Sequence, residues 1–184
     1  MTLLDLAIKA ARHGGLMPVH KTVRRRTGKT HRQMYHVKPD QGEAGAAKLL
    51  SRALALAEKM HSGQTDKAGE PYMQHVKRVV DGVKHPLAKI VAALHDTVED
   101  TSLDLPTIRR RFGKRVSDAV RTLTRVKDES YREHLERVAA DPLASEVKRA
   151  DLRDNMNLKR LPTVTDRDRE RVAKYAQALK FLER

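Results

Sequence analysis

The stretch Ala92-Ala-Leu-His-Asp-Thr-Val-Glu-Asp-Thr101 joins an apolar segment to a cluster of ionisable side chains. The apolar segment begins at Ile90, and we expect it to form a helix that ends near Asp96. At the end of that helix the sequence presents one histidine and three acids within six residues. The stretch therefore predicts a buried helix whose carboxyl end carries groups able to bind a cation.

Helical periodicity continues on both sides of this stretch. We expect a helix with an apolar face from about Ala44 to Met60, and another that Pro71 opens and Gly82 ends. Further helices are expected over residues 106–112, 116–123, 131–139, 144–158 and 166–182. Aromatic residues make up only 3% of the chain, which favours helix packing over a β-sandwich. We predict an all-α bundle of roughly seven or eight helices.

Cysteine is absent from the 184 residues. Disulfides and thiolate metal sites are therefore excluded, so any metal must be held by His, Asp or Glu. A cytoplasmic location agrees with this composition. Asp5 and Lys9 interrupt the apolar stretch at the N-terminus, which predicts neither a signal peptide nor a membrane span.

Positive charge is concentrated near the N-terminus. The formal net charge is +14, and Lys21 to Lys38 contains seven Lys or Arg and no acid. We interpret this segment as a basic β-hairpin that turns at Thr27-Gly28-Lys29, or alternatively as a disordered basic arm. The expected organisation is a short helix plus this hairpin or arm over residues 1–44, and a helical domain over residues 45–184. The charge favours an anionic partner, either nucleic acid or a small phosphorylated substrate.

The ionisable cluster could be either a solvated helix end or a catalytic site. Glu99 and Asp100 each follow an ionisable residue, His95 and Asp96, by four positions, so each pair shares a face if the helix continues. Two carboxylates beside a metal could orient or deprotonate a bound water. The bland interpretation is a helix that ends in a solvated acidic loop.

Two further segments supply similar groups. His75 stands early in a predicted helix, where a lone histidine is usually a core or surface residue. Asp151 lies between apolar residues and needs a partner if it is buried, although it could also be a surface acid paired with Lys148 or Arg153. With His95 and Asp96 the segments provide two imidazoles and two carboxylates, a set that suits Mn²⁺ or Fe²⁺ and also permits Zn²⁺.

These segments resemble, in the same order, the HD superfamily of phosphohydrolases. The likeness is strongest to the hydrolase domain of the RelA/SpoT alarmone enzymes and to the small alarmone hydrolases, and it covers about 130 residues from Ala53 to Leu182. The matching motifs are His61-Ser-Gly-Gln64, Gly69-Glu-Pro-Tyr72 with His75, the stretch 92–101, Phe112-Gly113 with Val116, Leu123-Thr124, and Val147-Lys148 leading to Asp151 and Asn155.

The resemblance implies an HD-type helical domain and a role for each matching residue. The metal ligands would be His75, His95, Asp96 and Asp151, usually for Mn²⁺, with Fe²⁺, Co²⁺ or Zn²⁺ as alternatives. Glu99 and Asp100 would activate the attacking water. The residues implied to contact the substrate are Lys67, Lys127, Lys148, Asn155 and Tyr175.

One position departs from the family pattern. Alarmone hydrolases often carry a basic pair before the Gly-Glu-Pro-Tyr motif, and its arginine lies on the base, whereas this chain has Asp66 and Lys67. An aspartate cannot stack on the base as arginine would. The base is therefore left open between guanine and adenine.

The expected reaction is metal-dependent hydrolysis of the 3′-pyrophosphate of (p)ppGpp or (p)ppApp, which gives a nucleotide and pyrophosphate. The sequence ends at Arg184 without a synthetase region, so we expect a chain that only degrades, with an alarmone synthetase toxin as its functional counterpart. One alternative is another nucleotide phosphatase, such as an NADPH 2′-phosphatase. The other is a nucleic-acid-binding or antitoxin module that uses Lys21–Lys38, whose affinity would fall steeply with salt.

Overall fold

The computed structural model describes residues 19–24, 30–35 and 43–184, and the chain divides into two compact units, Met1–Gly45 and Ala46–Arg184. In the first unit, β1 (Val19–Arg24) and β2 (Thr30–Tyr35) form an antiparallel pair, with Val19 opposite Tyr35 and Arg24 opposite Thr30. This pairing agrees with the predicted basic hairpin and not with the disordered arm that was its alternative. The predicted N-terminal helix and the hairpin turn lie outside the described residues.

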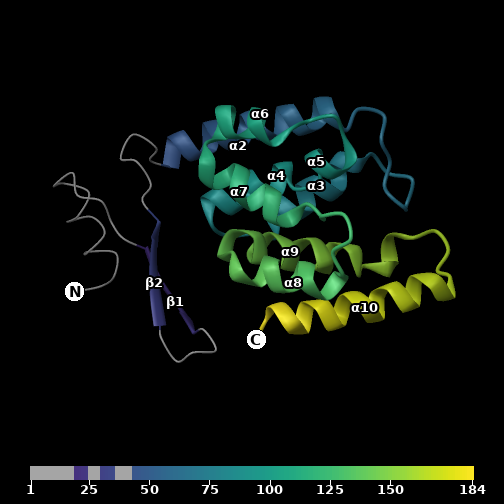
Figure 1. Ribbon diagram of the computed structural model, residues 1–184. Helices are drawn as coiled ribbons and strands as arrows, with labels where there is room; N and C mark the ends of the chain where they lie inside the picture. The colour runs from purple at the N-terminus through teal and green to yellow at the C-terminus, as the bar shows by residue number, and fades with distance from the viewer. Residues whose placement is uncertain (1–18, 25–29, 36–42) are drawn as a thin grey trace, which may run out of the picture. The chain divides into compact units, whose positions relative to one another are not determined.

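The rest of the described chain is helical, as predicted (Figure 1). The elements are α2 (Glu43–Met60), α3 (Tyr72–Asp81), α4 (Pro86–Leu94), α5 (Thr97–Asp100), α6 (Leu105–Phe112), α7 (Lys114–Leu123), α8 (Tyr131–Ala140), α9 (Pro142–Asn155), the 3-10 helix η1 (Leu158–Arg160) and α10 (Asp166–Leu182). None of these helices combines the length and the apolar character needed to cross a membrane, within the part of the chain that the structure describes.

Local sequence explains where the helices begin. Ser130 before α8 and Thr165 before α10 each form a capping box, with Glu133 and Asp168 respectively. In a capping box two side chains satisfy backbone N–H groups that have no partner inside the helix. Gly113 separates α6 from α7 with a φ of 89°, a conformation that strains residues with a Cβ. These signals fix helix boundaries close to those expected.

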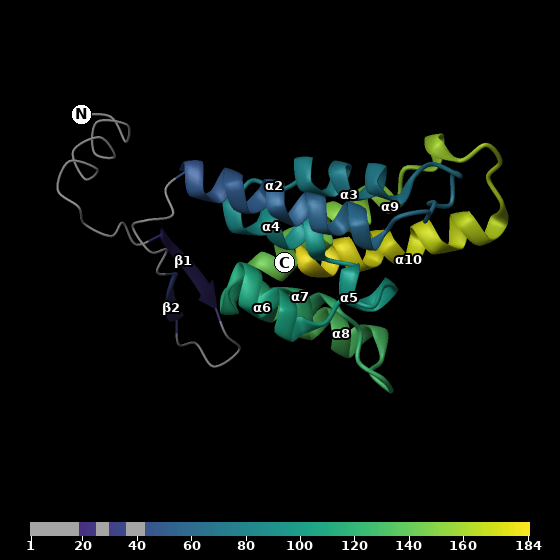
Figure 2. The ribbon, with the colours of Figure 1, turned by 90° about the horizontal axis from the view of Figure 1, so that it is seen from above.

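Helix α9 occupies the centre of the bundle and lies against α3, α4, α7, α8 and α10 (Figures 1 and 2). Helix α4 is also central, and its residues Ile90 to Leu94 are all buried. Burial of one such large apolar side chain stabilises the fold by about 1.5–3 kcal/mol. The two central helices consequently hold their polar residues in fixed positions.

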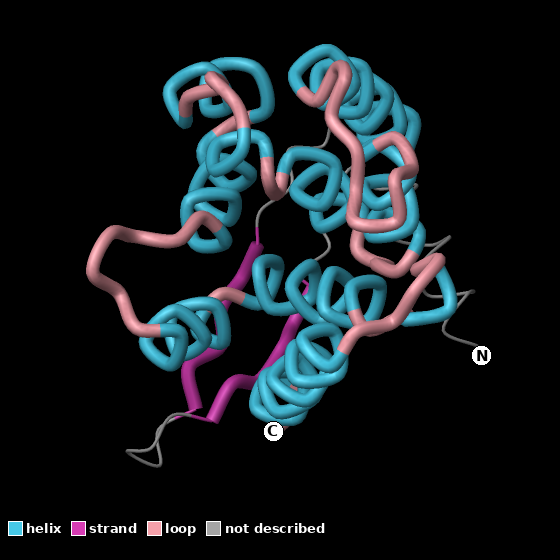
Figure 3. Tube along the Cα trace, turned by 90° about the vertical axis from the view of Figure 1, so that its right-hand side faces the viewer, coloured by secondary structure: helices cyan, strands magenta, loops and turns pink. Residues whose placement is uncertain are grey.

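Helix α4 ends at Leu94, two residues before the expected end. His95 and Asp96 form a turn, and α5 then begins at Thr97, although Asp100 N still donates to Asp96 O over 2.9 Å. The uninterrupted helix that would align Glu99 with His95 is therefore not present. The longer loops, at residues 61–71, 124–130 and 161–165, lie at the same end of the bundle as α5 (Figures 1 and 3).

Candidate active site

The four residues expected to hold a metal come together from two helices and a turn. His75 on α3, His95 after α4 and Asp151 on α9 are 4%, 4% and 5% exposed. Their ligand-type atoms lie within 4.8 Å of one another, so that, among the described residues, these three side chains form a group that could hold a metal ion. Asp96 adjoins it, since its Oδ2 lies 2.8 Å from His95 Nε2 and 3.8 Å from His75 Nε2.

Both imidazole rings are oriented through Nδ1. His75 Nδ1 lies 2.7 Å from Asp154 Oδ2, and His95 Nδ1 lies 2.8 Å from Ala92 O. These oxygens only accept hydrogen bonds, so Nδ1 carries the proton and Nε2 keeps its lone pair when the ring is neutral. An outer partner of this kind orients most metal-binding histidines.

The two Nε2 atoms face carboxylate oxygens. Asp151 Oδ1 lies 3.5 Å from His75 Nε2 and 3.9 Å from His95 Nε2. His95 Nε2 is buried and makes no hydrogen bond of normal geometry within the described structure, although Asp96 Oδ2 lies 2.8 Å away. A buried polar atom without a partner is costly, and a cation between the rings and the carboxylates would satisfy it. The residues present thus fit a divalent metal ion.

Electrostatics at the site favour positive charge. Burial lowers the pKa of His95, but the carboxylates of Asp96 and Asp151 and the carbonyl of Ala92 together outweigh it and raise that pKa to about 9. Burial raises the pKa of Asp96, but His95 and the hydroxyl of Tyr72, which donates to Asp96 Oδ2, hold it well below its usual value. The same field that stabilises a proton here would stabilise a metal cation.

Asp151 accepts hydrogen bonds from two side chains. Lys148 Nζ donates to its Oδ2 over 2.9 Å, and Asn155 Nδ2 donates to its Oδ1 over 2.5 Å. Burial lowers the pKa of Lys148, but Asp151, together with Asp96 and Tyr131, outweighs it and raises that pKa, so this lysine is charged. Lys148 and Asn155, both predicted to contact substrate, therefore lie directly beside the metal-type cluster.

The predicted acid pair lies on α5 at the edge of the cluster. Burial and the neighbouring carboxylates of Asp96 and Glu99 raise the pKa of Asp100. Glu99 Oε2 accepts from Arg125 N over 3.1 Å, which ties it to the loop 124–130. Asp100 O accepts from Gln64 Nε2 over 3.1 Å, so the loop 61–71 helps to position this helix.

A cavity of about 270 Å³ opens beside His75. Side chains from the loop 61–71, the end of α9, η1 and α10 line it, and those able to contact a nucleotide include Lys67, Tyr72, Asn155, Arg160, Arg171 and Tyr175. Of the predicted substrate contacts, Lys67, Asn155 and Tyr175 share this cavity. Lys127 lies elsewhere, exposed in the loop 124–130.

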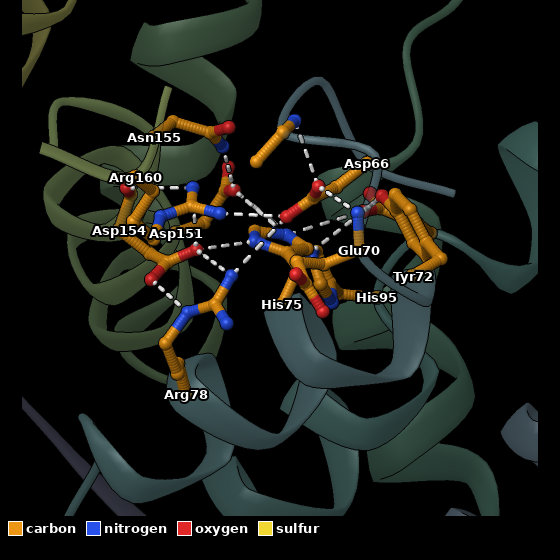
Figure 4. Close-up of polar contacts among 12 residues, drawn as sticks. Asp66, Glu70, Tyr72, His75, Arg78, His95, Asp151, Asp154, Asn155 and Arg160 are labelled. Carbon is orange, nitrogen blue, oxygen red and sulfur yellow. Dashed lines mark hydrogen bonds and ion pairs between the residues drawn. The ribbon is translucent and has the colours of Figure 1, made fainter. Parts of the chain in front are cut away.

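A network of two acids and two arginines joins the cavity to the cluster (Figure 4). Asp154, besides holding His75, accepts from Arg78 Nε over 2.6 Å and from Arg160 Nη2 over 3.3 Å. Asp66 Oδ2 accepts from Arg160 Nη1 over 2.6 Å and from Arg78 Nη2 over 3.4 Å. The interpretation of Asp66 as merely a lost positive charge is therefore incomplete, because its side chain is 8% exposed and serves as an anchor.

No role was predicted for Asp154, Arg78 or Arg160. Asp154 is 79 residues from His75, and Arg160 is 94 residues from Asp66. Helical spacing places Asp154 near Asp151 but does not reveal which distant histidine it meets. The one available signal was the departure at position 66, which invited a search for a compensating cation.

The fold and this cluster together define a helical domain with a His/Asp metal-type site. The family model described as "HD domain" matches residues 53–181. The chain belongs to the HD domain family.

Several known proteins are similar to this chain. The guanosine-3′,5′-bis(diphosphate) 3′-pyrophosphohydrolase of Aquifex aeolicus is 33% identical over 141 residues, which is 70% of this chain and 20% of that protein. A GTP pyrophosphokinase of Streptomyces coelicolor is 34% identical over 131 residues, 64% of this chain and 16% of that protein. This chain thus spans a fifth or less of the length of these curated relatives.

A solved structure gives a fuller overlap. It is described as a metazoan ortholog of SpoT that hydrolyzes ppGpp, and it has a TM-score of 0.63 with 26% sequence identity. The superposition covers 73% of this chain and 85% of that chain. The similarity therefore extends over most of the solved chain.

Proposed function

We propose that this chain hydrolyses the 3′-pyrophosphate of an alarmone nucleotide, (p)ppGpp or (p)ppApp, to a nucleotide and pyrophosphate. The observation that carries the proposal is the convergence of His75, His95, Asp96 and Asp151 beside an acid pair. The similarity to a 3′-pyrophosphohydrolase and to a ppGpp-hydrolysing SpoT ortholog supplies the substrate class.

His75, His95, Asp96 and Asp151 would hold a divalent cation, with Mn²⁺ as the first candidate and Fe²⁺, Co²⁺ or Zn²⁺ as alternatives. When bound, the cation lowers the pKa of a water and offsets phosphate charge. Asp154 and Ala92 O keep the two imidazoles in the tautomer that binds metal. The two imidazole rings are therefore oriented for metal binding before a cation binds.

Glu99 and Asp100 hold the attacking water and accept its proton. The raised pKa of Asp100 suits this role, because a general base works best when its pKa approaches the working pH. The water oxygen bonds to the phosphorus on the ribose 3′-oxygen, the bond from that phosphorus to the 3′-oxygen breaks, and the proton passes to the leaving oxygen. Lys148 lies beside Asp151 and offsets the charge of the phosphate groups.

The cavity suits the nucleoside end of the substrate. Its volume of about 270 Å³ lies just below the range of about 300–1,000 Å³ that is usual for small-molecule pockets, so it fits part of a nucleotide. Two of its cations are already balanced, Arg160 by Asp66 and Asp154 and Arg171 by Asp168. A pocket whose arginine charges are already paired, and which is lined by planar side chains, favours a base and ribose over a pyrophosphate.

The test is pyrophosphate release from ppGpp and ppApp, with Mn²⁺ and with chelator. Wild type should release pyrophosphate only with metal, and Asp96→Ala should abolish the release. Asp118→Asn is the matched control, since Asp118 pairs with Lys114 on the α7 surface and should leave activity unchanged. NADPH serves as a further substrate, and cleavage of NADPH in place of both alarmones would overturn the proposal.

A further inference from the structure

We propose that Arg160 is the platform on which the purine ring of the substrate stacks, and that Asp66 positions it. The proposal rests on the proposed function for the identity of the substrate. Its geometric basis is independent, because Arg160 lines the cavity beside His75 together with Tyr175 and Asn155.

The hydrogen-bonding edge of Arg160 is engaged by the protein. Nη1 donates to Asp66 Oδ2 over 2.6 Å, and Nη2 donates to Asp154 O over 3.2 Å and to Asp154 Oδ2 over 3.3 Å. Nε is buried and has no partner among the described residues. The part of the guanidinium that remains for a ligand is therefore its flat face.

A guanidinium face is a surface on which nucleobases stack. The side chain of Arg160 is 21% exposed and is restrained from two sides, so little rotamer freedom would be lost when a base binds. Stacking accepts any purine, because guanine and adenine both present a π-face. This residue would thus provide affinity for the base without selecting between the two.

Asp66 is built to hold both the loop and the arginine. Its Oδ1 accepts from Ala68 N over 2.8 Å and from Glu70 N over 3.1 Å, while its Oδ2 accepts from Arg160. The carboxylate thus fixes the loop 61–71 with one oxygen and the guanidinium with the other. Asp66→Asn can keep the loop contacts through Oδ1 while it turns an amide N–H₂ toward Arg160.

The experiment measures binding of GDP, ADP and inorganic pyrophosphate by isothermal titration calorimetry in the presence of Mn²⁺. Arg160→Lys keeps the charge and removes the plane, so the Kd for both nucleotides should rise about tenfold. The Kd for pyrophosphate should stay unchanged. Arg153→Lys is the matched control, because Arg153 on the same stretch of chain pairs with Glu183 at the surface.

The positioning role of Asp66 is tested by a double-mutant cycle. Asp66→Asn should raise the nucleotide Kd in the same direction, and it should add little in the Arg160→Lys background, because both changes act on one interaction. Additive effects would remove the positioning role, provided that circular dichroism shows folded variants.

Two results would overturn the platform itself. One is an unchanged nucleotide Kd in Arg160→Lys, and the other is an equal loss for pyrophosphate, which would place Arg160 on phosphate. Binding does not require turnover. An inactive wild type whose nucleotide Kd still depends on Arg160 would refute the proposed hydrolysis and leave the platform standing.

Discussion

Replacement of Asp154 by Asn tests whether the His75 ring is oriented for metal binding. The substitution preserves the shape of the side chain and removes its charge, while His75 Nδ1 lies 2.7 Å from Asp154 Oδ2. Loss of such an outer partner typically lowers metal affinity 10–100-fold. We expect a loss of that size, which corresponds to about 1.4–2.8 kcal/mol.

The assay is calorimetric titration of Mn²⁺ into metal-free wild type, Asp154→Asn and the control Asp118→Asn. Asp154 also accepts from Arg78 and Arg160, so the variant should lose stability as well. Urea unfolding without metal measures that loss separately. Arg78→Gln provides the comparison, because it breaks the ion pair with Asp154 and leaves the contact with His75.

These two variants separate the orientation of the His75 ring from overall stability. Asp154→Asn should weaken Mn²⁺ binding much more than Arg78→Gln does, even if both lose similar stability. A folded Asp154→Asn protein with a Mn²⁺ Kd within twofold of wild type would refute the reasoning. Equal weakening in both variants would show that the arginine network as a whole, and not the ring tautomer, supports the site.

Four further substitutions test the chemistry, the core and the pH dependence of stability. Glu99→Gln and Asp100→Asn should each lower kcat about 10²–10⁴-fold, the usual contribution of general acid–base catalysis, and leave the calorimetric Mn²⁺ Kd within a few-fold of wild type. Leu94→Ala should lower the free energy of unfolding in urea by about 2–5 kcal/mol, because this side chain is fully buried. Burial and nearby cations lower the pKa of His134 to about 4, and Arg137 donates to its Nδ1. Between about pH 6.5 and pH 4, His134 is protonated in the unfolded chain but neutral in the folded protein, so the free energy of unfolding should fall as the pH drops through this range. Urea titrations of His134→Gln should show a shallower fall.

The helical bundle was predictable because its signals are local. Apolar residues at helical spacing and breaks at His85-Pro86 and Gly113 are visible within a few turns of sequence. The cluster His95-Asp96 was also visible, as two adjacent ligand-type residues after an apolar helix. Residue type alone offered His75 and Asp151 as partners of this pair, but their assignment as ligands in one site depended on the family resemblance, because spacing alone does not bring distant segments together.

The charge network could not be predicted for the same reason. Asp66 and Arg160 are separated by most of the helical unit, and the turn at η1 that brings them together carries no strong local signal. From sequence alone, Asp66 removes a positive charge near the base. In the fold, Asp66 holds the positive charge of Arg160 near the base. An aspartate at position 66 therefore brings in a cation instead of removing one.

Asp154 connects the two halves of the site through one oxygen. Its Oδ2 lies 2.7 Å from His75 Nδ1 and accepts from Arg160 Nη2 over 3.3 Å. A change at Asp154 should therefore reach both metal affinity and nucleotide affinity, whereas Asp66 contacts only the arginines and the loop. Because the metal-type cluster and the Arg160 platform depend on the same carboxylate, binding of the cation and binding of the base are coupled through Asp154 without direct contact between the two ligands.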